Sequence, residues 1–560
     1  MNRTIQIYCR NAKRYLEVAG GTTLAEIAAL PELDLAFKPI CALANNKAEH
    51  LDFEIFSPKE IEFLDGRSGI GRDVYVRSLC MIAYRALLRV DAQLIIRIEH
   101  SISRGLFCRI FSHDMSHYEV TDAFTARLLA EMRAIIEADM PFERFEKRTD
   151  DVIELFRRQH LDDKVKLLET VSEIYTSYYM LDGVADSFYG PLAPSTGFIS
   201  IFDIKRWEDG LLLLGPDLAN PDMPAQPVTQ EKMFRAFTEH LEFNRVIRVA
   251  SVGELNRAVA NRQSSQLINV AEAMHNKLIG RIADEIADRK RNGGASVVLI
   301  AGPSSSGKTT SSKRLAIQLM TNLMTPKVIS LDDYFINREN TPRDETGDYD
   351  FESLYALDLE QFNADLRALL RGEQINLPSY SFELGRRVEK HRPLRLERND
   401  VLIVEGIHGL NPELTAAVPQ DQIFKMYVSA LTTLRIDNHN WISTSDNRLL
   451  RRIVRDFKYR HTLPEETIRR WPSVRRGEEK WIFPFQENAD ATFNSSLLFE
   501  IGVMKPFADP LLESVRHNVP EYTTAYRLLR FLKYFRSIPE ADVPSTSLLR
   551  EFLGGSSFHY

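Results

Sequence analysis

The sequence predicts an α/β fold for its second half, in which a parallel sheet is covered by helices. Two observations support this prediction. From Ser296 onward, helical stretches separate four short apolar runs, "SVVLIA", "KVISL", "DVLIVEG" and "IFKMYVS". Such runs are typical of strands that are buried on both faces. A loop rich in Gly and Ser follows the first run, where an α/β sheet places phosphate-binding loops.

The 560 residues are too many for one hydrophobic core, so further domains are expected in the first half. Residues 1–65 predict a small β-rich unit of the β-grasp type, because "TIQIYC" and "RYLEVA" alternate like strands. Thr23 and Glu26 predict a capping box at the start of a short helix.

The rest of the chain divides at composition changes. Residues 66–225 form a mixed region that is mostly helical by pattern, and it ends in the Pro-rich stretch "LANPDMPAQPVTQ". We expect a helical linker over 226–290, the α/β domain over 291–505, and a helical C-terminal tail over 506–560.

Composition excludes some classes of protein. A net charge of -7 argues against a generally basic nucleic-acid binder. The four widely spaced cysteines, Cys9, Cys41, Cys80 and Cys108, predict reduced thiols rather than a disulfide framework or a thiolate zinc site. The sequence has no signal peptide and no apolar run that could span a membrane, so we expect a cytoplasmic protein without a membrane partner. The pattern leaves the oligomeric state open.

The loop "GPSSSGKTT" predicts a phosphate-binding site. Gly302, Gly307, Lys308 and Thr309 fit the pattern G-x-x-x-x-G-K-[ST], in which backbone N–H groups point inward. Lys308 is expected to reach the β- and γ-phosphates, and the Thr309 hydroxyl to bind Mg²⁺. The predicted nucleotide-binding residues of the loop are Gly302, Pro303, Ser304, Ser305, Ser306, Gly307, Lys308, Thr309 and Thr310.

Transfer of a phosphoryl group also needs a base and a metal site. Asp332 ends the second apolar run, at the edge of the sheet where α/β proteins bind ligands, and it is a candidate base. The adjacent Asp333 is a less favoured alternative. Glu405 ends the third run and is a candidate magnesium ligand together with Thr309 and Asp332.

Four arginines predict a cationic lid. They are spaced i, i+3, i+4 and i+7, so they share one helical face, where like charges repel one another unless an anion meets them. We expect Arg448 and Arg451 to contact the transferred phosphoryl group, and Arg452 and Arg455 to contact the nucleotide.

Residues from about 296 to 500 resemble the uridine kinase and phosphoribulokinase family of P-loop kinases. The matching stretches are "GPSSSGKTT", "LDDYF", "DYDFESLYALD", "LPSYSF", "VLIVEGI" and "NRLLRRIVRD". The resemblance implies phosphorylation of a sugar hydroxyl, typically a nucleoside 5′-hydroxyl, with ATP and Mg²⁺.

The resemblance also implies roles for single residues. It carries Asp332 over as the base, and Thr309 and Glu405 as metal-site residues. Asp350 matches the acid that holds the ribose hydroxyls, and Tyr380 and Phe382 match aromatics of the base pocket. Gly385 stands where uridine kinases have a histidine that reads the pyrimidine, so a purine nucleoside is as good a candidate acceptor as uridine or cytidine.

The first half resembles the N-terminal half of threonyl-tRNA synthetases. Residues 1–65 are similar to a TGS domain, and the stretch "ADSFYGPLAPSTGFISIFDI" is similar to the editing domain that follows it, which implies an α+β fold for residues 66–225. The family's H-x-x-x-H and C-x-x-x-H positions hold Arg77, Met81, Phe188 and Leu192 here. These side chains cannot serve as general base or hard metal ligand, so we expect neither zinc nor deacylation of tRNA.

Two classes of function are therefore expected. The first is an ATP-dependent kinase, either of nucleosides or of another small sugar or alcohol, whose N-terminal half binds RNA or a regulatory ligand. The alternative is an ATP-binding regulator associated with RNA or the ribosome, with little turnover of small molecules.

Overall fold

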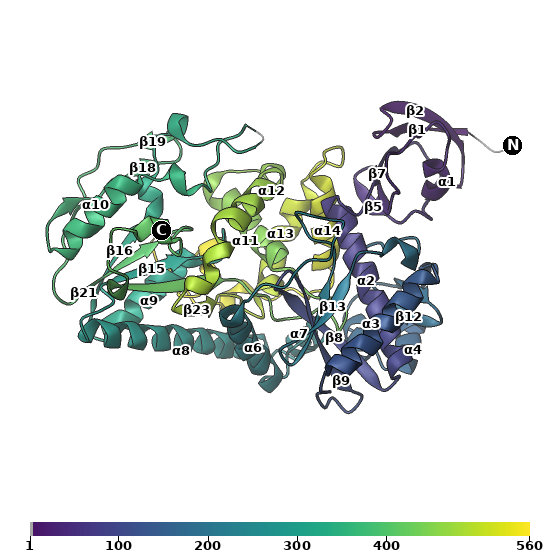
Figure 1. Ribbon diagram of the computed structural model, residues 1–560, viewed down its shortest axis with the longest axis horizontal. Helices are drawn as coiled ribbons and strands as arrows, with labels where there is room; N and C mark the ends of the chain where they lie inside the picture. The colour runs from purple at the N-terminus through teal and green to yellow at the C-terminus, as the bar shows by residue number, and fades with distance from the viewer. Residues whose placement is uncertain (1–3, 346, 560) are drawn as a thin grey trace.

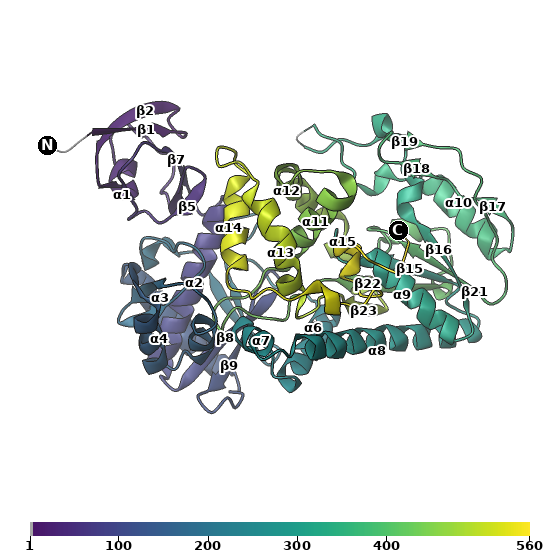
Figure 2. The same ribbon diagram turned by 180° about the vertical axis from the view of Figure 1, so that it is seen from behind.

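The computed structural model describes residues 4–345 and 347–559. The two N-terminal domains lie at one end of an elongated molecule, and the parallel sheet lies at the other, with the long helix α8 running along it (Figures 1 and 2).

The first domain is a β-grasp unit with the strand order β2-β1-β7-β4-β5. Helix α1 (Leu24–Ala28) begins at the predicted capping box, which is confirmed: the Glu26 N–H donates to the Thr23 hydroxyl, and the Glu26 carboxylate accepts from the Thr23 N–H. The strands are β1 (Thr4–Cys9), β2 (Arg14–Ala19), β3 (Thr22–Thr23), β4 (Cys41–Ala44), β5 (Lys47–Glu49), β6 (Glu54–Ile55) and β7 (Glu60–Leu64).

The second domain has the α+β fold that its resemblance to the editing domain implies, with more β-structure than the mostly helical pattern of its sequence indicated. Its strands form two sheets, ordered β10-β11-β12 and β13-β14-β9-β8. Short apolar runs such as "GLLLL" of β14 do not distinguish a strand from a buried helix by periodicity, which explains the difference. The elements are α2 (Gly69–Val90), β8 (Leu94–Ile102), β9 (Gly105–Ser112), α3 (Asp122–Glu137), β10 (Glu143–Arg148), α4 (Thr149–Arg158), α5 (Asp162–Leu168), β11 (Tyr175–Leu181), β12 (Val184–Asp186), β13 (Asp203–Trp207) and β14 (Gly210–Leu214).

Three helices follow, α6 (Glu231–Val246), α7 (Val252–Ala260) and α8 (Ser264–Arg291). Leu255 of α7 and Ile279 of α8 are fully buried in the same hydrophobic core as Val298 and Phe424 of the parallel sheet. This segment is therefore part of the α/β core rather than a loose connection.

The predicted parallel sheet is confirmed, with the strand order β16-β21-β15-β22-β23. The four apolar runs form β15 (Val297–Ala301), β16 (Thr325–Ser330), β21 (Asp400–Glu405) and β22 (Ile423–Ser429). The sequence prediction missed β23 (Ala491–Asn494), because "ATFN" is too short and too polar to stand out as a buried strand.

Helices cover this sheet and continue into the C-terminal part of the chain. They are α9 (Lys308–Thr321), α10 (Leu359–Leu370), α11 (Thr444–Arg460), α12 (Pro464–Trp481), α13 (Glu500–Glu513), α14 (Tyr522–Leu532) and α15 (Arg550–Leu553). Two small ribbons pair β17 (Ile375–Asn376) with β20 (Pro393–Leu394), and β18 (Tyr380–Ser381) with β19 (Arg386–Arg387).

The four cysteines are buried and free, as expected for reduced thiols. Among the described residues, no helix combines the length and the apolar character that a membrane span requires.

Buried charges join the second domain to the α/β domain. Lys164 of α5, whose side chain is 2% exposed, pairs with Asp186 of β12 at 2.8 Å and with Asp437, from the segment after β22, at 2.9 Å. Burial alone would raise the pKa of Asp186, but Lys164 and His439 outweigh it and lower that pKa. Charges withdrawn from water in this way are stabilised only by partners held in good geometry.

We predict that Lys164→Met destabilises the junction, because it leaves two carboxylates buried without their cation. The free energy of unfolding from urea titration should fall by about 3–5 kcal/mol. Arg67→Met is the control, since the Arg67–Asp222 pair is exposed and should contribute under about 1 kcal/mol. A loss for Lys164→Met as small as that of the control would contradict the prediction.

Candidate active site

The phosphate loop connects β15 to α9 in a conformation that requires glycine at two positions. A Cβ atom on Gly302 would lie 2.0 Å from the carbonyl oxygen of Val428. Because this oxygen belongs to the backbone, no side-chain movement could relieve the clash. Gly307, the N-cap of α9, has a φ of 85°, in the left-handed region that L-residues disfavour. The loop can therefore curl around an anion at the start of the helix.

Polar atoms of the loop face inward. The Lys308 ammonium donates to the carbonyl oxygens of Gly302 (3.0 Å) and Pro303 (3.2 Å). The Ser305 and Ser306 hydroxyls are buried and have no hydrogen-bond partner among the residues that the structure describes. This arrangement of a cation, unpaired hydroxyls and a helix N-terminus fits a phosphate chain.

Two carboxylates stand beside the loop at the carboxyl edge of the sheet. Glu405 ends β21, which lies between β15 and β16, so it stands between the loop and the end of the Asp332 strand. It accepts from the hydroxyls of Thr309 (3.4 Å) and Ser330 (3.0 Å). Burial and the nearby Asp332 carboxylate raise the pKa of Glu405 to about 7, while Lys308 opposes the rise.

Asp332 and Asp333 follow β16 in a short 3-10 turn, Leu331–Tyr334. Partial desolvation by the surrounding protein raises the pKa of Asp332, and the nearby Lys308 opposes this rise. The residue is still exposed to solvent, which limits the size of the rise. Asp333 instead binds the Arg392 guanidinium at 2.8 Å. Among the described residues, Asp332 forms no such ion pair, which leaves its carboxylate available to accept a proton.

The oxygen donors at this edge fit a magnesium ion. Thr309, Glu405 and Asp332 supply one hydroxyl and two carboxylates, the hard ligands that Mg²⁺ takes together with water and substrate phosphates. Among the described residues, no group of three or more His, Cys, Asp and Glu side chains is arranged to hold a metal alone.

Arg448 and Arg451 are not at the mouth of the site. Their side chains are 1% and 0% exposed, and they form ion pairs with Glu478 and Glu500 respectively. Arg448 donates to the Ser304 carbonyl oxygen at 3.0 Å, and Arg451 donates to that of Ser305 at 3.3 Å. The like charges are thus met by carboxylates of the protein itself, and the two guanidiniums bind backbone carbonyl oxygens of the loop, which is a different setting from the exposed cationic lid that the spacing predicted.

Arg452 and Arg455 lie closer to the site. Arg452 donates to the Ser304 hydroxyl at 2.8 Å and pairs with Asp456 at 3.2 Å. Arg455 pairs with the same carboxylate at 2.7 Å, and it acts electrostatically on Asp332, as does Arg460. The cations near the mouth therefore share one counter-ion, Asp456, which leaves part of their charge for an anion.

Glu352 belongs to the site, although sequence reasoning missed it. Burial and the nearby Glu478 raise its pKa to about 7, and one of its carboxylate oxygens has no partner among the described residues. Asp350 is half-buried two positions earlier, and its carboxylate accepts from the Glu352 N–H at 3.2 Å. The motif "DYDFES" marked this segment but not which of its acids faces the loop.

An aromatic cluster follows Asp332 in the chain. Phe335 lies with its ring centroid 5.6 Å from Tyr380 and 5.5 Å from Phe382, and these two lie 5.1 Å apart. Phe335 was not predicted.

Beside the aromatic cluster, Gly385 has a φ of 65°, and a Cβ atom there would lie 2.7 Å from the Arg338 guanidinium. Arg338 thus occupies the space that a side chain at position 385 would need.

In the second domain, the four positions that depart from the H-x-x-x-H and C-x-x-x-H pattern lie in the packed interior. Met81, Phe188 and Leu192 are buried, and the buried Arg77 guanidinium donates to the Pro191 carbonyl oxygen (3.1 Å). A Cβ atom on Gly190 would lie 2.7 Å from that guanidinium, so the side chain fills its surroundings.

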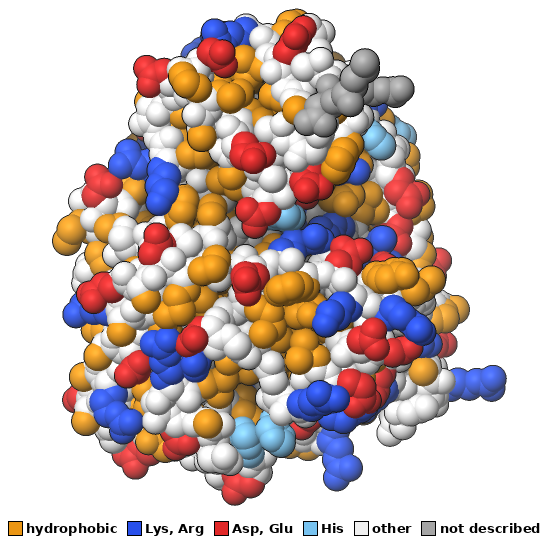
Figure 3. Space-filling model, turned by 90° about the vertical axis from the view of Figure 1, so that its right-hand side faces the viewer, with side chains coloured by type: hydrophobic (Ala, Val, Ile, Leu, Met, Phe, Trp, Pro, Cys, Tyr) orange, Lys and Arg blue, Asp and Glu red, His pale blue; other side chains and the backbone are white. Residues whose placement is uncertain are grey.

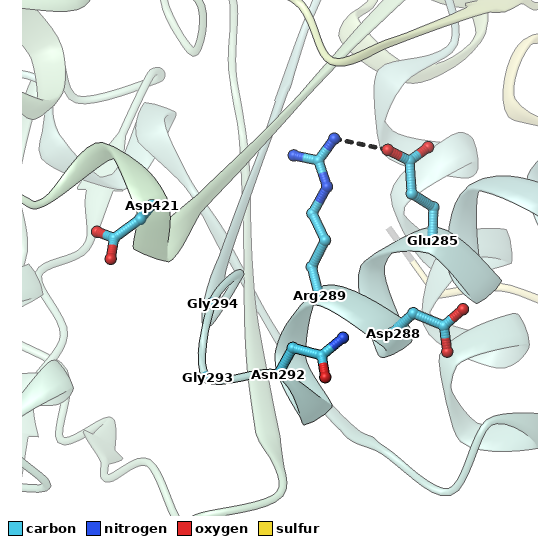
Figure 4. A pocket seen from close by; sticks show the side chains of 7 residues that line it. All are labelled: Glu285, Asp288, Arg289, Asn292, Gly293, Gly294 and Asp421. Atoms are coloured by element: carbon cyan, nitrogen blue, oxygen red, sulfur yellow. Dashed lines mark hydrogen bonds and ion pairs between the residues drawn. The ribbon is translucent and has the colours of Figure 1, made fainter.

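An open pocket of about 620 Å³ lies at the opposite edge of the sheet (Figure 4). It is found where the chain enters β15 and β22, and carboxylates dominate its polar lining. The lining residues are Glu285, Asp288, Arg289, Asn292, Gly293, Gly294 and Asp421. This pocket is remote from the phosphate loop and has the wrong charge for a phosphate.

Comparisons with known proteins match both halves of the chain. The chain is 30% identical to a uridine kinase of Bacillus pumilus over 195 residues, which are 35% of this chain and 83% of that protein. It is 28% identical to a threonine–tRNA ligase of Desulforamulus reducens over 182 residues, 32% of this chain but only 28% of the ligase.

Among solved structures, a D-glycerate 3-kinase of Cryptococcus neoformans aligns with a TM-score of 0.21 and 16% sequence identity. The alignment covers 46% of this chain and 86% of the D-glycerate 3-kinase chain. The profile of the Phosphoribulokinase / Uridine kinase family matches residues 297–497, which include the phosphate loop, Asp332 and Glu405. Together with its likeness to the Bacillus uridine kinase, this match establishes that the chain belongs to the phosphoribulokinase and uridine kinase family.

Proposed function

We propose that the protein is an ATP-dependent nucleoside kinase that phosphorylates the 5′-hydroxyl of a ribonucleoside. The observation that carries the proposal is the gathering of Lys308, Thr309 and Glu405 with the basic carboxylate of Asp332 at one edge of the sheet. One side of this site fits a phosphate chain, and the other leads to an aromatic cluster.

ATP and Mg²⁺ are assigned to the phosphate side. The loop's N–H groups, Lys308 and Arg452 would hold the phosphates, and Thr309, Glu405 and Asp332 would hold the metal. A bound magnesium ion supplies neutralisation of the charge that develops on the phosphates.

Asp332 is assigned as the base. Its carboxylate takes the proton of the attacking hydroxyl, and its raised pKa makes it a stronger acceptor than an ordinary aspartate. Asp350 is assigned to the ribose hydroxyls, and Phe335, Tyr380 and Phe382 to stacking on the base. Because Gly385 and Arg338 replace a pyrimidine-reading histidine, purine and pyrimidine nucleosides are both candidate acceptors.

The role of the N-terminal half is proposed as regulatory. Figure 3 shows that the end of the molecule with the N-terminal domains carries acidic and basic side chains interspersed over its surface. Nucleic-acid interfaces usually gather positive charge in a patch or stripe. On this face the charges are mixed rather than gathered, which favours a regulatory ligand over RNA as the partner of the N-terminal half.

We predict that Lys308→Ala abolishes ATP turnover and leaves the fold intact, because the lysine neutralises phosphate charge and does not fill the core. Release of ADP in the presence of nucleosides measures turnover, and circular dichroism checks the fold. Unchanged turnover in a folded variant would contradict the assignment of the loop.

We predict that Asp332→Asn lowers kcat by roughly a hundredfold or more, since asparagine keeps the size but cannot take the proton. ATP should still bind, as calorimetry can show. Asp333→Asn is the matched control: it removes the neighbouring charge, which already pairs with Arg392, and should cost much less. A larger loss in the control would move the base to Asp333.

We predict that Asp350→Asn mainly raises KM for the nucleoside, because the lost contact is present in the ground state and the transition state alike. Steady-state kinetics with ribonucleosides and their 2′-deoxy analogues measures this effect. Equal rates for the two kinds of sugar would show that Asp350 does not hold the ribose hydroxyls.

A further inference from the structure

The last part of the chain contacts both N-terminal domains, α7 and the start of α9. We call residues 514–559 the C-terminal strap. The carbonyl oxygen of His517 accepts from Asn46 of the β-grasp domain at 2.9 Å, and that of Tyr534 accepts from Asn256 of α7 at 2.7 Å. The strap then returns to the parallel sheet, where the C-terminus lies in both views (Figures 1 and 2).

At its end the strap reaches the phosphate loop. The Glu551 carboxylate accepts a hydrogen bond from the Thr310 hydroxyl at 2.6 Å and a second one from the Thr310 N–H at 3.2 Å. Thr310 is the third residue of α9, in the first turn, whose N–H groups point toward an anion bound at the helix N-terminus. A carboxylate of the protein thus holds donors that a phosphate oxygen would use.

The position of Glu551 is fixed by its neighbours. Leu548 packs so closely on Gly307 that a Cβ atom there would lie 2.7 Å from it, and the Phe552 side chain is fully buried with its ring 5.2 Å from the Arg451 guanidinium. The Lys458 ammonium donates to the carbonyl oxygen of Leu553. Buried side chains on both sides of Glu551 therefore present its carboxylate to the loop.

The charge of Glu551 also acts on the site. It is one of the carboxylates whose field favours the charged form of Lys308, the cation assigned to the phosphates. A triphosphate entering the loop would meet a negative charge at the Thr310 donors, and it would compete with that charge for the same hydrogen bonds.

We propose that Glu551 is an autoinhibitory carboxylate, which stands in for phosphate at Thr310 and must leave these donors before the triphosphate binds. The inference rests on the proposed function in one respect, that the loop binds ATP. The apparent affinity for ATP is then reduced by the fraction of molecules in which Glu551 has left the donors. Because the strap also contacts the β-grasp domain and α7, movement of the N-terminal half can change that fraction.

Calorimetric titration of the full chain with ATP and Mg²⁺ tests the inference. Glu551→Gln keeps the size of the side chain and removes its charge, so it should tighten the ATP Kd by roughly tenfold. Glu551→Asp keeps the charge on a side chain one methylene shorter, and it should tighten Kd by a smaller factor. Glu513→Gln, an exposed position at the end of α13, makes the same change of charge and should leave Kd unchanged.

Thermal unfolding gives a second readout. Without ATP, Glu551→Gln should unfold at a lower temperature than the wild type, because the Thr310 contact is weakened. The rise in Tm on adding ATP should be larger in the variant, since the nucleotide no longer has to displace a charge. A role confined to stability would lower Tm and leave the ATP-induced rise unchanged.

The outcomes separate the inference from the proposed function. If the wild type binds ATP and Glu551→Gln binds it equally or more weakly, the inference is overturned and the kinase assignment stands. If ATP binds to Glu551→Gln but not to the wild type, the inference is supported in its strongest form. If neither the wild type nor any of the variants binds ATP, the proposed function fails, and the inference fails with it.

Discussion

The shape of the phosphate loop depends on two guanidiniums buried beneath it. Arg448 and Arg451 of α11 donate to the carbonyl oxygens of Ser304 and Ser305. A buried guanidinium is tolerated only with a counter-ion, which Glu478 of α12 and Glu500 of α13 provide. Glu478 also accepts from the Ser304 N–H at 3.0 Å, so the ion-paired side chains fix both the carbonyl and the amide groups of this part of the loop.

The segment that leads into the same helix connects it to the N-terminal half. Residues 430–440, which lead from β22 toward α11, are all buried, and Asp437 among them pairs with Lys164 of the second domain. The C-terminal strap makes a second connection, from the β-grasp domain through α7 to Thr310. The two halves are therefore joined through the elements that shape the loop and supply charge to it, which is the arrangement that regulation of a kinase by its N-terminal half would need.

The sequence predicted the elements that depend on contacts between residues close together in the chain. The capping box at Thr23 and the four apolar strands could be read from the sequence, since each depends on residues within a few positions. The expected roles of Arg448 and Arg451 do not agree with their burial, because their partners lie 30 and 49 residues away in the chain. Glu551, 241 residues after Thr310, had no sequence signal at all, and Glu352 was hidden beside a better-known acid.

ADP release from ATP and Mg²⁺ in the presence of a panel of purine and pyrimidine ribonucleosides, with other small sugars and alcohols for comparison, decides whether the protein is a nucleoside kinase. We expect at least one ribonucleoside to stimulate ADP release and to be recovered as its 5′-monophosphate. Stimulation by another sugar or alcohol alone would contradict the nucleoside assignment, and no stimulation by any acceptor would contradict the assignment of a small-molecule kinase.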